Sequence, residues 1–151
     1  MKQLLLILAL LLSSMTFLNA CVYALSEELK EQASQVEEIP VNVSEQTKQY
    51  LEQLMKNLEE MQNWNVESTN RLKEYFEKAS QGKLHRSQLR EYVQNMQQQH
   101  YNFRDLMNKM PVPKDLPEDL RKKMYDGSAN ISTGFLLRTE AMQIILDYLN
   151  T

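Results

Sequence analysis

Residues 44–81 read SEQTKQYLEQLMKNLEEMQNWNVESTNRLKEYFEKASQ, and apolar side chains recur along them in steps of seven. Ser44 is a favourable N-cap, and Gly82 follows the segment where a helix end favours glycine. The two core rows are Leu51, Leu58, Asn65, Leu72 and Ala79, and Leu54, Met61, Ser68 and Tyr75. This pattern predicts a long amphipathic helix that packs against other helices.

A second helix is predicted over residues 87–110, with Ser87 as its N-cap and Pro111 and Pro113 beyond its end. Its first core row is Leu89, Met96, Phe103 and Met110, and its second is Tyr92, Gln99 and Leu106. The apolar stripe is widened by Val93, His100 and Met107.

A third helix is predicted over residues 116–150. It begins near Asp115, with Pro117 in its first turn, and Asp126-Gly127-Ser128 is a candidate interruption. Its last turns are apolar over a wide arc, through Phe135, Leu137, Ala141, Met142, Ile144, Ile145, Leu146, Tyr148 and Leu149. An arc of this width predicts burial between two neighbouring helices.

Together these segments predict an all-α fold, an up-down-up three-helix bundle with coiled-coil-like packing in residues 44–151. Short connections make consecutive helices antiparallel, and this length is sufficient for an independent core. An extended coiled coil that completes its core by dimerisation stays open as an alternative. The polar step at Asn65 and Ser68 is compatible with either architecture, so a homo-oligomer through helix packing is not excluded.

The N-terminus has the organisation of an export signal. Lys2 is its only charge, and an unbroken apolar run covers residues 4–12. The sequence Leu18-Asn19-Ala20-Cys21 that follows resembles the lipobox of bacterial lipoproteins, a resemblance that covers only these four residues and the apolar run before them. It implies that residues 1–20 are removed, that the Cys21 sulfur carries a diacylglyceryl group and that the new amine can be acylated. Cys21 would then be the lipid anchor to the membrane.

Two other fates of the N-terminal segment stay open. Cleavage after Ala24 would release a freely secreted protein, and an uncleaved segment over residues 4–25 is just long enough to span a bilayer. All three possibilities place the chain from about residue 26 outside the cytoplasm. Residues 21–43 are acidic and Gln-rich and contain Pro40, which predicts a largely flexible tether.

A polar layer is predicted to cross the otherwise apolar core. If the turns centre near residues 84 and 114, Ser68 lies opposite His100, and His100 lies opposite Ser128. In the first interpretation His100 forms hydrogen bonds within the layer and fixes helix register. In the others, the layer is a ligand cleft or a groove for a partner helix. The candidate residues are Trp64, Asn65, Ser68, His100, Tyr101 and Tyr125.

The remaining composition limits the function. A net charge of −3 gives no electrostatic reason to bind nucleic acid, and one Cys cannot form an intramolecular disulfide. The two histidines, fifteen residues apart, do not form a zinc pattern, and no phosphate loop or nucleophile motif is present. We therefore expect no catalytic residue, metal or cofactor, but a lipid-anchored extracytoplasmic binding or scaffolding module with a protein partner, in the cell membrane or outer membrane. A freely secreted protein, or a bundle that senses a small ligand or metal through the His100 layer, stays open.

Overall fold

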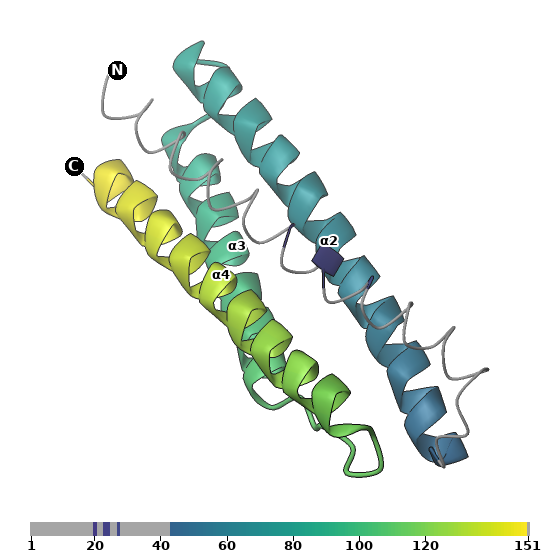
Figure 1. Cartoon of the computed structure of the whole chain (residues 1–151). Helices are drawn as coiled ribbons and strands as arrows, with labels where there is room; N and C mark the ends of the chain where they lie inside the picture. Colours follow the sequence, from purple (N-terminus) through teal and green to yellow (C-terminus); the bar gives the residue numbers. More distant parts are fainter. Residues whose placement is uncertain (1–19, 21–22, 25–26, 28–42, 151) are drawn as a thin grey trace.

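The computed structural model describes residues 20, 23, 24, 27 and 43–150. Its body consists of three long helices, α2 (Glu45–Ser80), α3 (Arg86–Asn108) and α4 (Glu118–Asn150), which lie side by side (Figure 1). The predicted all-α fold of three mutually packed helices is confirmed. The predictions for the signal peptide, for Cys21 and for most of the tether fall outside the described residues.

The two ends of α2 agree with the sequence prediction. Ser44 is the N-cap, and its Oγ accepts a hydrogen bond from the backbone N–H of Thr47 at 3.2 Å. After the last turn, Gly82 has a φ of 68°, and the N–H of Lys83 donates to the carbonyl of Lys78 at 2.8 Å. This is the glycine-terminated helix end in which a left-handed residue satisfies the last carbonyls.

The start of α3 differs from the prediction, because the N-cap is His85 and not Ser87. The Nδ1 atom of His85 accepts from the backbone N–H of Ser87 at 3.3 Å, and the Gln88 side chain accepts from the backbone N–H of His85 at 3.1 Å. An unprotonated imidazole nitrogen is an acceptor, so His85 can do what a serine hydroxyl does at this position. The helix ends at Asn108, before Pro111 as expected.

The connection between α3 and α4 holds the beginning of α2. Asp115 does not cap α4, which begins three residues later at Glu118. The Asp115 carboxylate instead accepts from the backbone N–H of Ser44 at 2.9 Å and from the Thr47 hydroxyl at 2.7 Å. These bonds lower the pKa of Asp115 to about 2. The helix that follows is continuous, so the interruption considered at residues 126–128 does not occur.

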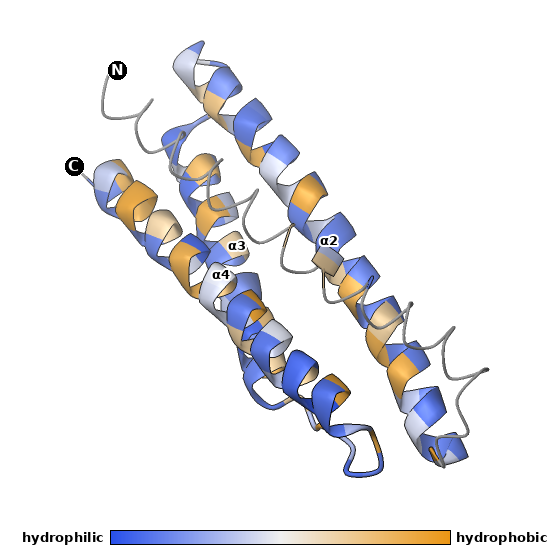
Figure 2. Ribbon diagram, in the orientation of Figure 1, coloured by the Kyte–Doolittle hydropathy of each residue, from blue (hydrophilic) through white to orange (hydrophobic). Residues whose placement is uncertain are grey.

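The core divides into two apolar clusters, one at each end of the bundle. The first contains Leu54, Leu58, Met61, Met107, Leu116, Leu120, Met124, Ile131 and Phe135. The second contains Leu72, Leu89, Val93, Met96, Ala141, Met142, Ile145, Leu146 and Leu149. The ribbon coloured by hydropathy shows apolar residues gathered in the second half of α4 (Figure 2). In the described part of the chain no helix has the length and apolar character needed to cross a membrane.

The helix α3 is rotated relative to the expected core rows. Val93, His100 and Met107 are buried, whereas Gln99 and Leu106 of the second expected row are exposed. The reason is that α3 packs most closely on α4, while no Cα atom of α2 lies within 8 Å of one in α4. The α3 positions that were expected to widen the stripe therefore form its centre.

Candidate binding sites of the bundle

A buried polar layer separates the two apolar clusters. Its members are Asn65, Ser68, Thr69, His100, Arg138 and Thr139, each less than one-tenth exposed. The structure thus brings together three residues that the sequence predicted to share a layer, and the indole of Trp64 meets the ring of His100 edge-on at 5.4 Å between centroids. The core of this protein is therefore not continuously apolar.

The contribution of α4 to the layer comes from further along the helix than predicted, from Arg138 and Thr139. His100 faces Phe135, with ring centroids 5.7 Å apart, and not Ser128, whose hydroxyl donates to the carbonyl of Tyr125 at 3.0 Å. The connection over residues 109–117 is not helical, so the predicted turn centre near residue 114 placed the wrong residues of α4 beside α3.

Two of the six candidate residues do not join the layer. Tyr101 is 45% exposed on α3, and Tyr125 is 59% exposed on α4. Tyr101 is the chain neighbour of His100, and consecutive helical residues point about 100° apart, so the burial of one directs the other outward. The structure therefore gives no common cleft that contains all six residues.

Arg138 is the residue of the layer that sequence reasoning missed. Its side chain is fully buried, and its Nη2 atom donates to the Thr69 hydroxyl at 2.8 Å, which donates to the carbonyl of Asn65 at 2.9 Å. The Nε and Nη1 atoms have no hydrogen-bond partner among the described residues. Burial lowers the pKa of Arg138 to about 10, so the guanidinium remains protonated at neutral pH.

His100 is buried beside this cation without a hydrogen bond to any described residue. Neither ring nitrogen has a partner in the described part of the chain, so the bonds expected to fix helix register are not formed there. Burial, and then the positive charge of Arg138, hold the pKa of His100 well below its ordinary value of 6.5. The imidazole is therefore neutral at physiological pH, with one N–H donor and one acceptor.

A groove of about 240 Å³ opens between α2 and α3 at the level of the layer. It is lined by Trp64, Glu67, Ser68, Arg71, Tyr92, Asn95, Met96 and Gln99. The Tyr92 hydroxyl crosses from α3 and donates to the carbonyl of Ser68 at 2.8 Å. Trp64 lines the groove and also contacts the ring of His100, so the groove lies beside the polar layer.

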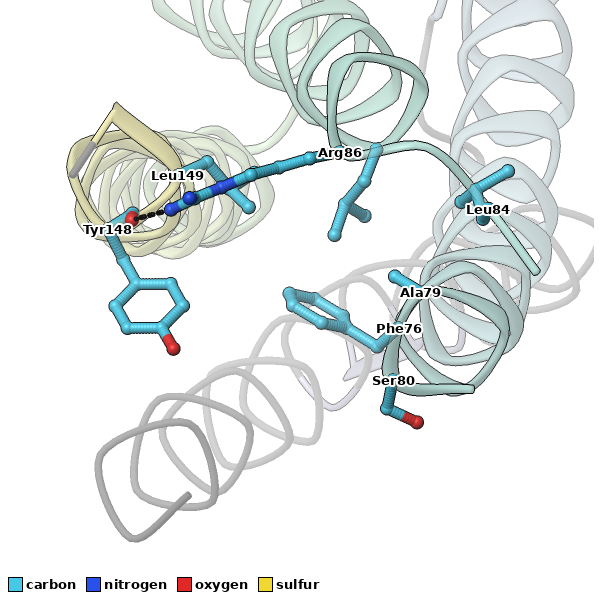
Figure 3. Close-up of a pocket in the computed structure, with 8 residues that line it drawn as sticks. Phe76, Ala79, Ser80, Leu84, Arg86, Tyr148 and Leu149 are labelled. Carbon is cyan, nitrogen blue, oxygen red and sulfur yellow. Dashed lines mark hydrogen bonds between the residues drawn. The ribbon is translucent and has the colours of Figure 1, made fainter. Parts of the chain in front are cut away.

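A second pocket, of about 300 Å³, lies at the end of the bundle where α2 ends, α3 begins and α4 ends. Figure 3 shows Arg86 extending from the start of α3 to the carbonyl of Tyr148, which accepts its Nη2 proton at 2.7 Å. One turn later, Arg90 donates to the carbonyl of Leu149 at 3.1 Å. Cations at the last carbonyls of a helix complement its dipole, so these two arginines hold the end of α4.

The outer face of α4 carries a stripe of exposed apolar side chains. It consists of Leu137, Ile144 and Tyr148, which are 44%, 48% and 40% exposed. Residues seven and four positions apart lie on one helix face, so the three form a row and are not scattered. The row corrects the prediction that the whole apolar arc of α4 is buried, and it ends at Tyr148 beside the second pocket.

No three His, Cys, Asp or Glu side chains gather into a group able to hold a metal ion within the described residues. Comparison of the chain with protein-family models, with curated proteins and with solved structures finds no match in any of the three.

Proposed function

We propose that this chain is a lipid-anchored helical module that binds a protein partner outside the cytoplasm of a bacterial cell, and that it has no catalytic activity of its own. The anchoring part of the proposal rests on the sequence, because Leu18-Asn19-Ala20-Cys21 resembles a lipobox and follows an apolar run of signal length. One acyl chain alone gives only marginal membrane residence, whereas two or three acyl chains on Cys21 would hold the bundle firmly.

The observation that supports the binding part is the apolar stripe of Leu137, Ile144 and Tyr148. Single exposed apolar residues are normal on a protein surface, but three of them aligned along one face of a helix favour an interaction site. Spacings of seven and four residues match the apolar face of another helix, which would lie along α4. We therefore assign this surface to an amphipathic helix of a separate envelope protein.

The anchor is tested by labelling cells with a palmitate analogue. The unaltered chain should incorporate the label, and Cys21→Ser should not. Mass spectrometry of the N-terminus should show cleavage between Ala20 and Cys21 with the mass of the acyl chains. An N-terminus that begins after Ala24 would instead establish the secreted alternative, and an intact leader would establish the uncleaved one.

The partner surface is tested by placing a photo-crosslinking amino acid at Ile144 in cells, with the exposed position Glu59 on α2 as the matched control. A discrete adduct should form at Ile144 and not at Glu59, and it should disappear in the double variant Leu137→Lys, Tyr148→Lys. Because these side chains are substantially exposed, the double variant should remain folded. A product of twice the mass of the chain would identify a second copy and would overturn the assignment of a separate partner.

A further inference from the structure

The polar layer carries a positive charge that no described residue neutralises. Arg138 is fully buried, and none of the ion pairs Lys48–Glu45, Lys78–Glu74 and Lys109–Asp105 involves it, since all three lie on the surface. Removing a charge from water without a counter-charge is strongly unfavourable, and proteins rarely retain such an arrangement unless a partner completes it. The charge of Arg138 is therefore a feature that needs a counterion.

The hydrogen-bonding capacity around Arg138 also exceeds what the described residues use. Thr69 accepts one guanidinium proton, while Nε and Nη1 of Arg138 and both ring nitrogens of His100 are buried without a partner among the residues that the structure describes. Four such atoms in one layer are a concentrated deficit, because nearly all buried polar groups in native proteins are satisfied. An acceptor with a negative charge would satisfy the guanidinium N–H groups and accept the N–H of the neutral imidazole.

We propose that Arg138 and His100 form an internal binding site for a small monocarboxylate that carries an apolar remainder. A planar carboxylate can accept two hydrogen bonds from one guanidinium group, and its single charge balances the single charge of Arg138. A sulfate or phosphate dianion would leave excess negative charge in the core.

The surroundings of the two residues favour an apolar remainder. Phe135 lies 5.7 Å from the His100 ring, and Phe103 lies 5.3 Å from Phe135. Met96, four residues before His100, and Met142, four residues after Arg138, both belong to the second cluster and are buried. Methionine side chains adapt readily to a neighbour of irregular shape. The groove between α2 and α3 is lined by Trp64, whose indole contacts the His100 ring, so a ligand would enter on this side of the layer.

The site contains its own spectroscopic probe, because Trp64 is the single tryptophan of the chain and contacts His100. The experiment uses the purified full-length chain in detergent at pH 7.5, in a buffer free of carboxylates. Acetate, butyrate and hexanoate are titrated at constant ionic strength against sodium chloride and sodium sulfate. Tryptophan fluorescence and the midpoint of thermal unfolding are both recorded.

The carboxylates should change the fluorescence of Trp64 saturably, with one ligand per chain, and hexanoate should bind more tightly than acetate. The midpoint of thermal unfolding should rise by roughly 10 °C at a hundredfold excess over the Kd. Arg138→Met should lose both responses. Lys122→Met removes an exposed cation from the same helix and should retain both, so it is the matched control. Arg138→Lys keeps the charge but not the planar donor pair, and it should bind at least about tenfold more weakly.

The proposal is overturned if the unaltered chain shows no saturable response, or if chloride or sulfate at the same ionic strength acts as strongly as hexanoate. It is also overturned if Arg138→Met responds like the unaltered chain. Should Arg138→Met fail to fold, the titration of the unaltered chain and the comparison with Arg138→Lys still decide the question. Because binding is measured on purified protein, the result is independent of the lipid anchor and of the protein partner.

Discussion

Replacing His100 by Leu should stabilise the protein at pH 7.5 and reduce its sensitivity to mild acid. The imidazole is buried with neither nitrogen hydrogen-bonded to a described residue, and each unsatisfied polar group of this kind costs about 1–3 kcal/mol. The substitution also removes the contacts of the ring with Trp64 and Phe135, which are worth about 0.5–1.5 kcal/mol each. The two unsatisfied nitrogens together cost more than the two ring contacts contribute. The free energy of unfolding should therefore rise by about 1–3 kcal/mol at pH 7.5.

The pH dependence follows from the lowered pKa of His100. In the unfolded chain this histidine takes up a proton as the pH falls through its ordinary pKa of 6.5, whereas in the folded protein burial and Arg138 keep it neutral. The unfolded state therefore binds more protons, and stability is lost as the pH falls below 6.5. If the folded protein stays unprotonated at this site, the loss between pH 7.5 and pH 5.0 is about 2 kcal/mol. Leu at position 100 should abolish this part of the loss.

The assay is urea unfolding followed by circular dichroism at pH 7.5, 6.5 and 5.0. Phe103→Leu serves as the control, since it changes a ring that also contacts Trp64 and Phe135 but carries no titratable group. It should lose stability between pH 7.5 and 5.0 as the unaltered protein does. If His100→Leu is less stable than the unaltered protein at pH 7.5, the prediction is wrong and the His100 imidazole is hydrogen-bonded in the folded protein. A flat stability profile of the unaltered protein over this range would refute the burial of a neutral histidine.

Three further predictions concern the scaffold. Asp115→Asn should abolish the part of the acid destabilisation that occurs as the pH falls from about 4 to about 2. The pKa of Asp115 is depressed because its ionised carboxylate accepts bonds from Ser44 and Thr47, so these bonds weaken when it is protonated. Urea unfolding at pH 2–5 measures this. Gly82→Ala should lower the free energy of unfolding by about 1 kcal/mol, and the cost is conformational, since φ is 68° and no other atom lies within 4 Å of the added Cβ position. Leu58→Ala should lower it by about 2–5 kcal/mol, because Leu58 is fully buried in the first cluster; both are measured in urea at pH 7.5.

The parts of the fold that depend on local signals could be predicted from the sequence. Ser44 and Gly82 define the ends of α2 through cap chemistry that involves only a few neighbouring residues. The predicted N-cap of α3, Ser87, was wrong because histidine is an unusual N-cap residue. The spacing of His85 and Gln88 nevertheless matches that of a capping box and could have indicated His85. Helix existence and boundaries are thus set mainly by short-range chemistry.

The register of α4 against α3 could not be predicted, because it depends on the path of a connection without repeating pattern. Asp115 has the features of a helix start, yet its carboxylate binds the beginning of α2 and α4 begins later. An early helix start with a turn near residue 114 placed Ser128 beside His100, where the structure has Phe135. Arg138 was missed for a different reason, since an arginine on an amphipathic helix is usually solvated. A signal was nevertheless present, because Arg138 lies three residues after Phe135 and four before Met142, on the buried face of the helix.

The position of α2 explains why the polar layer can exist within a core of this size. Since no Cα atom of α2 comes within 8 Å of α4, the space between these helices is filled by long side chains and not by close backbone packing. Arg138 is one of these side chains, and its bond to Thr69 joins α4 to α2 across the bundle. Thus α3 and α4 approach each other closely, whereas α2 meets α4 through side chains such as Arg138. The Arg138–Thr69 bond can fix the register of α4 against α2, whereas His100 makes no such bond among the described residues and is therefore the member of the layer that the proposed ligand would engage.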